Sequence, residues 1–81
     1  MDDRTILSRI GDLVDEEHRL RTQVQRGDVS TDEEHARLRT LEESLDQCWD
    51  LLRRRRAARA AGQDPDAANP RDVDEVEKYL Q

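Results

Sequence analysis

The sequence predicts an all-α protein built on an antiparallel two-helix hairpin with coiled-coil-like spacing, followed by a short C-terminal helix. Two segments carry apolar residues at alternating three- and four-residue spacings, which is the periodicity of one helix face. A short break containing Gly27 separates them, and short connections make neighbouring helices antiparallel. We therefore expect a hairpin over residues 1–62, with helices at about 3–26 and 31–61. A proline-containing linker and a short helix are expected over residues 63–81.

The first helix has a clear start signal and one apolar seam. Asp2 or Asp3 is expected to cap it, because a carboxylate there accepts hydrogen bonds from the free amides of the first turn. The seam consists of Ile6, Ile10, Leu13, Leu20 and Val24. Leu7 and Val14 widen the apolar stripe to one side, so the helix is expected to be amphipathic.

Glu17 interrupts this seam at the position that would otherwise make it continuous. A carboxylate there either reaches outward to water or pairs with a cation such as His18, Arg21 or Arg37. We interpret Glu17 and His18 as a structural polar pair rather than as catalytic groups, because two helices offer little pocket around a substrate.

The break between the helices combines a helix stop with a helix start. Gly27 suits the left-handed conformation just past a helix end, and Ser30 with Glu33 matches a capping box. The seam of the second helix consists of Leu38, Leu41, Leu45, Cys48 and Leu52. Gly62 is expected to end this helix. Folding about the turn pairs residues whose numbers add to roughly 58, which sets one seam against the other over its full length.

One hairpin alone is not expected to bury all of its apolar surface. Hydrophobic residues are 33% of the chain against 42% charged residues, and Trp49 and Tyr79 are the only large aromatic side chains. A two-helix seam would leave four apolar side chains partly exposed: Leu7, Val14, Trp49 and Leu51. We therefore expect a homodimer in which two hairpins form a four-helix bundle.

The C-terminal segment differs in character from the hairpin. Two prolines and the lack of apolar periodicity mark residues 63–70 as a linker. Val73, Val76, Tyr79 and Leu80 then fall on one face of a short helix. Because so few residues do not hold a helix in isolation, we expect this helix to dock on the hairpin or on its dimer mate.

The strongest charge feature is a run of arginines near the end of the second helix. Five cations stand without an acid between them: Arg53, Arg54, Arg55, Arg56 and Arg59. They fit a solvated, salt-bridged helix end, with Asp2 and Asp3 close by, or a surface for an acidic protein partner. The net charge of -6 and the lack of aromatic residues among the arginines disfavour nucleic acid as the partner.

Several function classes find no support in the residue pattern. No apolar run is long enough to span a bilayer. The lone Cys48 cannot form an internal disulfide, which suits a reducing cytoplasm. The spacing typical of metal ligands, glycine-rich phosphate loops and catalytic triads is absent from the sequence, so we expect no cofactor, metal or catalytic residue.

These features favour a small, non-enzymatic adaptor that docks on a larger cytoplasmic protein, with regulation as one role that it could serve. Trp49 is the most prominent candidate anchor, since tryptophan and arginine commonly dominate binding energy. The expected contact surface comprises Trp49, Arg53, Arg54, Arg55, Arg56, Arg59, Val76, Tyr79 and Leu80. The alternative is a dimeric sensor whose arginines converge on a phosphorylated small molecule or nucleotide.

Several strings of the sequence also resemble those of a family of short actinobacterial proteins. They lie at residues 13–21, 45–53 and 76–81, and the turn at residues 62–66 is similar as well. The resemblance covers nearly the whole chain and implies a small cytoplasmic protein. Since that family is known only as a domain of unknown function, the resemblance implies no activity, ligand or catalytic residue.

Overall fold

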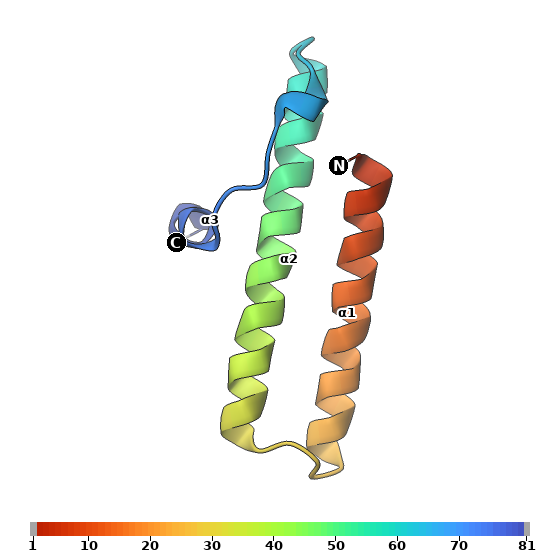
Figure 1. Ribbon diagram of the computed structural model, residues 1–81, viewed down its shortest axis with the longest axis vertical. Coiled ribbons are helices and arrows are strands. Elements are labelled where there is room, and N and C mark those ends of the chain that lie inside the picture. The colour runs from red at the N-terminus through yellow and green to blue at the C-terminus, as the bar shows by residue number, and fades with distance from the viewer. Residues whose placement is uncertain (1, 81) are drawn as a thin grey trace.

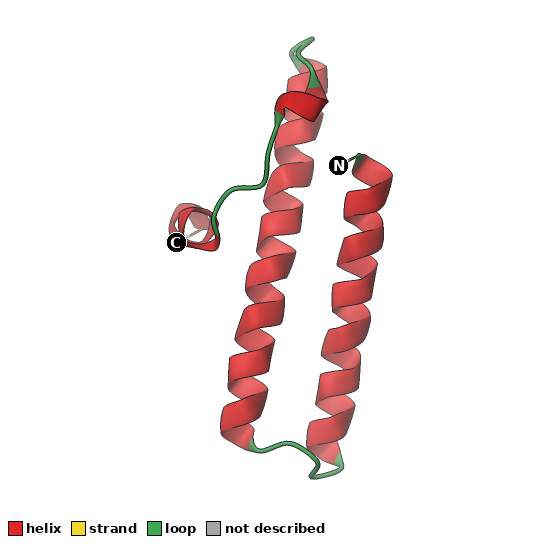
Figure 2. Ribbon diagram, in the orientation of Figure 1, coloured by secondary structure: helices red, strands yellow, loops and turns green. Residues whose placement is uncertain are grey.

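The computed structural model describes residues 2–80 as helices joined by short connections (Figure 2). Helix α1 spans Asp3–Gln25 and helix α2 spans Thr31–Ala60. A single-turn 3-10 helix, η1, spans Pro65–Ala67, and helix α3 spans Val73–Leu80. The all-α hairpin with a short C-terminal helix is confirmed, and each long helix ends one residue before the predicted position.

Local sequence signals define both ends of the two long helices. Asp2 caps α1 by accepting a hydrogen bond from an amide of the first turn at 2.8 Å, and Ser30 caps α2 in the same way at 3.2 Å. At the C-terminal ends, Gly27 and Gly62 have φ angles of 78° and 73°. The residue after each glycine donates to the carbonyl five residues earlier, which closes both helix ends with the same motif.

The two long helices pack antiparallel in the predicted register (Figure 1). The core at their open end consists of Ile6, Ile10, Leu51 and Leu52, with Leu45, Cys48 and Ala68 packed against it. Asp3 and Arg55, whose numbers add to 58, form an ion pair at 2.7 Å. Leu13 and Leu20 continue the buried seam toward the turn, so the seams predicted from spacing do meet.

The connection after α2 folds back along the helix that it has just left (Figure 1). Asp64 caps η1 by accepting from the amide of Asp66 at 2.9 Å, and Pro65 occupies the first position of η1. Apolar periodicity does not predict η1, because the contacts that hold it come from α2. Arg55 of α2 donates to the Pro65 carbonyl at 3.1 Å.

Helix α3 lies on the side of α2 that points away from α1. Figure 1 shows α3 end-on beside α2, so its axis crosses that of the long helix. Val76 is the buried side chain of α3, at 1% exposed. In this structure α3 docks on the hairpin of its own chain.

The molecule is thin in one direction. The principal extents of its Cα trace are 51 × 25 × 14 Å. Figure 1, viewed down the shortest axis, shows α1 and α2 side by side with α3 running along the viewing direction, so the hairpin itself is a single layer of helices. Most domains bury apolar faces between two layers, and this hairpin is therefore left with broad sides that lack a second layer.

Candidate functional site

One broad side of the hairpin is partly covered by the chain itself. The linker brings Pro70 close to Ile6 and Arg9 of α1 and to Leu51 of α2, around a small hollow. Below we call this the linker side. On this side, one flank of each long helix is already covered by the chain's own linker.

The opposite side, called the open side below, carries three large apolar side chains. Leu7 comes two residues before Arg9, and Trp49 comes two residues before Leu51. Because two residues turn an α-helix by about 200°, both project away from the linker. Val14 follows Leu7 by two helical turns and shares its side. Leu7 is 45% exposed, Val14 38% and Trp49 40%, so the exposure predicted for these three residues is confirmed.

Leu51 does not belong to this exposed set, and that expectation was wrong. Its side chain is 3% exposed because the linker folds over it. Ala68 and Pro70 supply the covering contacts. The linker has no apolar periodicity of its own, so its path along α2 does not follow from a seam.

The arginine run divides into cations that hold the fold and cations that stay free. Arg55 is 4% exposed and donates to Asp3 at 2.7 Å, to Asp66 at 2.9 Å and to the carbonyl of Pro65. Arg59 also pairs with Asp3. The hydrogen bonds from Arg59 and Arg55 hold the pKa of Asp3 well below its ordinary value. These five residues, called the Arg55 cluster below, join the start of α1, the end of α2 and η1.

Arg54 is committed at a second point along the linker. It donates to Asp50 at 3.1 Å and to the carbonyl of Asn69. Asp50 is 4% exposed and also lies 3.7 Å from Arg71, whose carbonyl accepts from Gln47 at 3.0 Å. The sequence did not single out Asp50 or Gln47. The four-residue spacing from Asp50 to Arg54 was the one signal available.

These contacts reduce the predicted contact surface. Arg54, Arg55 and Arg59 bind the chain's own carboxylates and carbonyls. For these three arginines, the expectation of a salt-bridged helix end is therefore met. Arg53 and Arg56 are exposed and make no hydrogen bond or ion pair within residues 2–80. Two cations of the run are therefore free for a partner.

The C-terminal candidates also divide. Val76 was expected in the contact surface, and this expectation was wrong, because its side chain is the one by which α3 is buried on α2. Tyr79 and Leu80 are 72% and 49% exposed. They remain candidates for contact with a partner.

The polar interruption of the first seam has a different partner from the expected one. Glu17 accepts from Arg21 at 3.1 Å, which was one of the cations considered, and not from His18. The carbonyl of His18 accepts from the hydroxyl of Thr22 at 3.0 Å. Residues four apart share a helix face and adjacent residues do not, so the Glu17–His18 pairing was wrong.

The docking of α3 on α2 brings several carboxylate side chains of the two helices close together. Glu77 of α3 lies in a cleft with Glu42, Glu43 and Asp46 of α2, which Arg39 also lines. One carboxylate oxygen of Glu77 is buried without a hydrogen-bond donor. The neighbouring carboxylate of Asp46, burial and the negative charges of Glu43 and Glu42 raise the pKa of Glu77. The ionised form of Glu77 therefore opposes the docking of its own helix.

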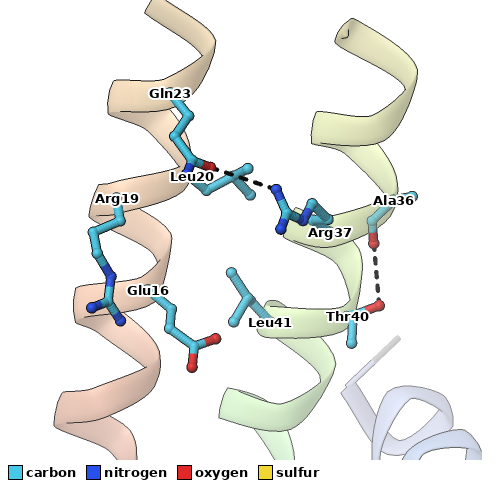
Figure 3. A pocket seen from close by; sticks show the side chains of 8 residues that line it. All are labelled: Glu16, Arg19, Leu20, Gln23, Ala36, Arg37, Thr40 and Leu41. Carbon is cyan, nitrogen blue, oxygen red and sulfur yellow. Dashed lines mark hydrogen bonds between the residues drawn. The ribbon is translucent and has the colours of Figure 1, made fainter. Parts of the chain in front are cut away.

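A shallow groove lies between α1 and α2 near the turn, where the linker does not reach (Figure 3). Leu20 and Leu41 line it together with polar side chains. Arg37 donates to Gln23 across the two helices at 3.5 Å, and the Thr40 hydroxyl donates to a backbone carbonyl of its own helix at 3.2 Å. Arg37, Gln23 and Thr40 are thus engaged with groups of the chain itself.

Across residues 2–80, no group of three or more His, Cys, Asp or Glu side chains is arranged to hold a metal ion. No helix in that range combines the length and hydropathy that crossing a bilayer requires. Cys48 packs against the core, and partial burial raises the pKa of its thiol.

Comparison with known proteins confirms the resemblance found in the sequence. The family described as "Protein of unknown function (DUF2630)" matches residues 2–81. Uncharacterized proteins of Mycobacterium bovis and of two strains of Mycobacterium tuberculosis are each 52% identical over 77 residues, covering 95% of this chain and 88% of the relative. No solved structure matches the chain.

Proposed function

We propose a non-enzymatic protein-interaction role for this chain, which belongs to the family of proteins of unknown function DUF2630. In this proposal the chain is a cytoplasmic adaptor that binds a protein partner through the open side of the hairpin. The simplest partner is a second copy of the chain, and a larger protein would dock on the resulting dimer.

One observation carries this proposal. Leu7, Val14 and Trp49 stay 38 to 45% exposed on one side of the hairpin, and Arg53 and Arg56 stand free near Trp49 on α2. Contiguous exposed apolar side chains commonly mark interaction surfaces. Tryptophan and arginine are the residues that most often dominate binding energy. These apolar and arginine side chains suit contact with a protein surface and include no nucleophile, which favours an interaction module over an enzyme.

The phosphate-binding sensor has weaker support. A phosphorylated ligand needs several converging cations, and Arg54, Arg55 and Arg59 are engaged with the chain's own groups. Only Arg53 and Arg56 of the run remain for it among the described residues. A thermal-shift screen of nucleotides on the full chain tests this alternative, and a ligand-specific rise in melting temperature would favour it.

Affinity capture with matched variants tests the adaptor. The tagged full chain is expressed in cells that produce the protein, as wild type, as a Leu7→Ser/Trp49→Ala variant, and as an Arg19→Ala control on the linker side. Wild type and control are expected to retain the same proteins, including an untagged copy of the chain, and the open-side variant is expected to lose them. Identical capture by all three would contradict the proposal.

A further inference from the structure

We propose that two copies of the chain pair antiparallel through their open sides, about a two-fold axis that crosses the hairpin near Trp49, so that Arg56 of each copy faces Glu42 of the partner subunit. This inference rests on the proposed function, because it names the first partner of the open side. It further assigns the direction of pairing and the contacts that select it.

The size of the open side suits a second copy. The hairpin is one layer of two helices that lie side by side. Its shorter helix has 23 residues and is about 35 Å long, and two helices side by side are about 20 Å wide. Each copy therefore offers roughly 700 Å², close to the share that one protein contributes to a standard interface. Stacking two such layers gives a four-helix bundle with the usual two-layer core.

The side chains of α2 on this side form a line with opposite charges at its ends. Glu42, Trp49 and Arg56 are spaced by seven residues, so they stand one above another along the helix. All three side chains are exposed. The acid and the base each lie about 10 Å from the indole along the helix axis. Trp49 is therefore the midpoint of the line.

A two-fold axis across this midpoint exchanges the two ends of the line. Arg56 then faces the partner's Glu42, and Glu42 faces the partner's Arg56, so one dimer contains two such pairs. The two Trp49 side chains meet near the axis, where they can stack. Arg53 lies close to Arg56 on the same helix and adds positive charge at the same end.

The side chains of α1 fit the same axis. In the hairpin register, where Asp3 meets Arg55, residue 9 of α1 stands level with Trp49. Leu7 lies two residues before that level and Val14 five residues after it. Exchanging the ends therefore brings Leu7 of one copy to within about 5 Å, along the helix axis, of Val14 of the partner subunit, whereas the two Val14 side chains lie about 15 Å apart along that axis. The same two-fold axis therefore forms both the charged contacts between the two α2 helices and the apolar contacts between the two α1 helices.

Measurement of mass and of tryptophan emission tests the pairing. We expect light scattering on the purified full chain at micromolar concentration to give about 19 kDa, twice the 9.5 kDa of one chain. Trp49 is the only tryptophan, so its emission maximum should shift to shorter wavelength as the concentration rises and the indole is buried. A single-chain mass with unchanging emission over the whole concentration range would overturn the inference.

Charge reversal tests the contact between Arg56 and Glu42. Arg56→Glu and Glu42→Arg should each weaken dimerisation roughly tenfold, since each reversal sets like charges face to face twice in a dimer. The double variant Glu42→Arg/Arg56→Glu restores opposite charges and should recover most of the affinity. An Arg19→Glu control on the linker side should have no effect. A double variant no stronger than the two single variants would overturn the assigned contact.

Cross-linking tests the direction of pairing. In a Cys48→Ser background, Leu7→Cys and Val14→Cys chains are mixed and treated with a short bismaleimide. The mixture should cross-link efficiently and the Val14→Cys chain alone should cross-link poorly, because Val14 lies near the partner's Leu7 and far from the partner's Val14. Both side chains are partly exposed, and circular dichroism checks that the variants keep their helices. A dimer in which the Val14→Cys chain alone cross-links as well as the mixture, or in which the mixture does not cross-link, would overturn the antiparallel arrangement.

The two proposals fail in different ways. A chain that stays single, yet loses a captured protein on Leu7→Ser/Trp49→Ala, overturns the pairing and leaves the proposed function standing. A chain that is an antiparallel dimer, yet captures the same larger proteins with and without these substitutions, supports the pairing and overturns the docking role of this side.

Discussion

The segment that follows α2 is attached to it at two places with opposite electrostatics. At η1, the Arg55 guanidinium lies between the carboxylates of Asp3 and Asp66. At α3, the carboxylate of Glu77 lies against that of Asp46 and close to other acids of α2. The first attachment is therefore stabilised by charge, and the second is opposed by it.

This difference shows what each attachment does for the fold. The Arg55 cluster satisfies a buried cation with several acceptors, so the linker and the start of α1 are held firmly. Helix α3 depends on the burial of Val76 and must overcome repulsion between carboxylates. The attachment at η1 is therefore firm and is called the firm anchor below, whereas the attachment of α3 that follows it is weaker and depends on the charge of its carboxylates.

The largest effect is expected at the firm anchor. Arg55→Met removes the buried cation and leaves Asp3 and Asp66 facing each other without it, so the melting temperature should fall on the order of 10 °C. Arg53→Met is the matched control, because Arg53 is exposed on the same helix. Thermal melts followed by circular dichroism check this, and equal melting temperatures for the two variants would contradict the role of the cluster.

The second effect concerns the apolar contact of α3. Val76→Ala should weaken docking of α3 by about 1–2 kcal/mol, because a buried side chain loses two methyl groups. Hydrogen exchange of the amides in residues 73–80 should accelerate accordingly, and that of the core amides of α1 should not. Tyr79→Ala is the control, since its ring is 72% exposed. Equal acceleration by both substitutions would show that α3 does not dock through Val76.

The third effect is the acid sensitivity of the firm anchor. The pKa of Asp3 is lowered in the folded chain, so its contribution is complete above its ordinary pKa of 3.8 and is lost as the pH falls below that value. The melting temperature should therefore drop as the pH falls from about 5 to about 2.5. Asp3→Asn should lower the melting temperature at neutral pH and flatten this dependence. An unchanged acid limb in the variant would exclude Asp3 as its source.

The smallest effect has the opposite sign and lies at α3. The pKa of Glu77 is raised, so its contribution to docking is complete below its ordinary pKa of 4.5 and is lost as the pH rises through the raised value. Glu77 faces Asp46, Glu42 and Glu43, with Arg39 in the same cleft. The Val76 methyl resonances should report tighter docking at mildly acidic pH than at neutral pH.

A matched pair of substitutions sharpens this last prediction. Glu77→Gln removes the titrating group and should make docking independent of pH, with tighter docking at neutral pH than in wild type. Glu75→Gln is the control, because Glu75 is exposed on the same helix. If the control shifts the Val76 resonances as much as Glu77→Gln does, net charge and not this contact would be responsible.

The hairpin was predictable because its determinants are local or periodic. Gly27 and Ser30 end one helix and begin the next through contacts within a few residues. The two seams then leave one register in which both are buried. The three exposed side chains of the open side follow from the same periodicity, since they lie beside a seam that only two helices enclose.

The roles of individual arginines could not be predicted in the same way. Arg55 and Arg56 are adjacent and chemically identical, yet one is buried in the Arg55 cluster and the other is free. Their environments differ because the linker passes over Arg55 and not over Arg56. The path of the linker could not be predicted, because its sequence lacks apolar periodicity. The same cause explains why Leu51 was expected to be exposed and why the partner of Asp66 was not foreseen.

The Arg55 cluster also has a consequence for the order in which a growing chain can acquire its structure. Arg55 binds Asp3, 52 residues earlier, and Asp66, 11 residues later. A ribosome therefore releases the beginning of α1 long before the groups that fasten it exist. The hairpin can close first at the Gly27 turn, where the loop is shortest, and extend toward its open end. Until residue 66 has emerged, the nascent chain lacks the complete set of ion pairs that holds the open end of the hairpin.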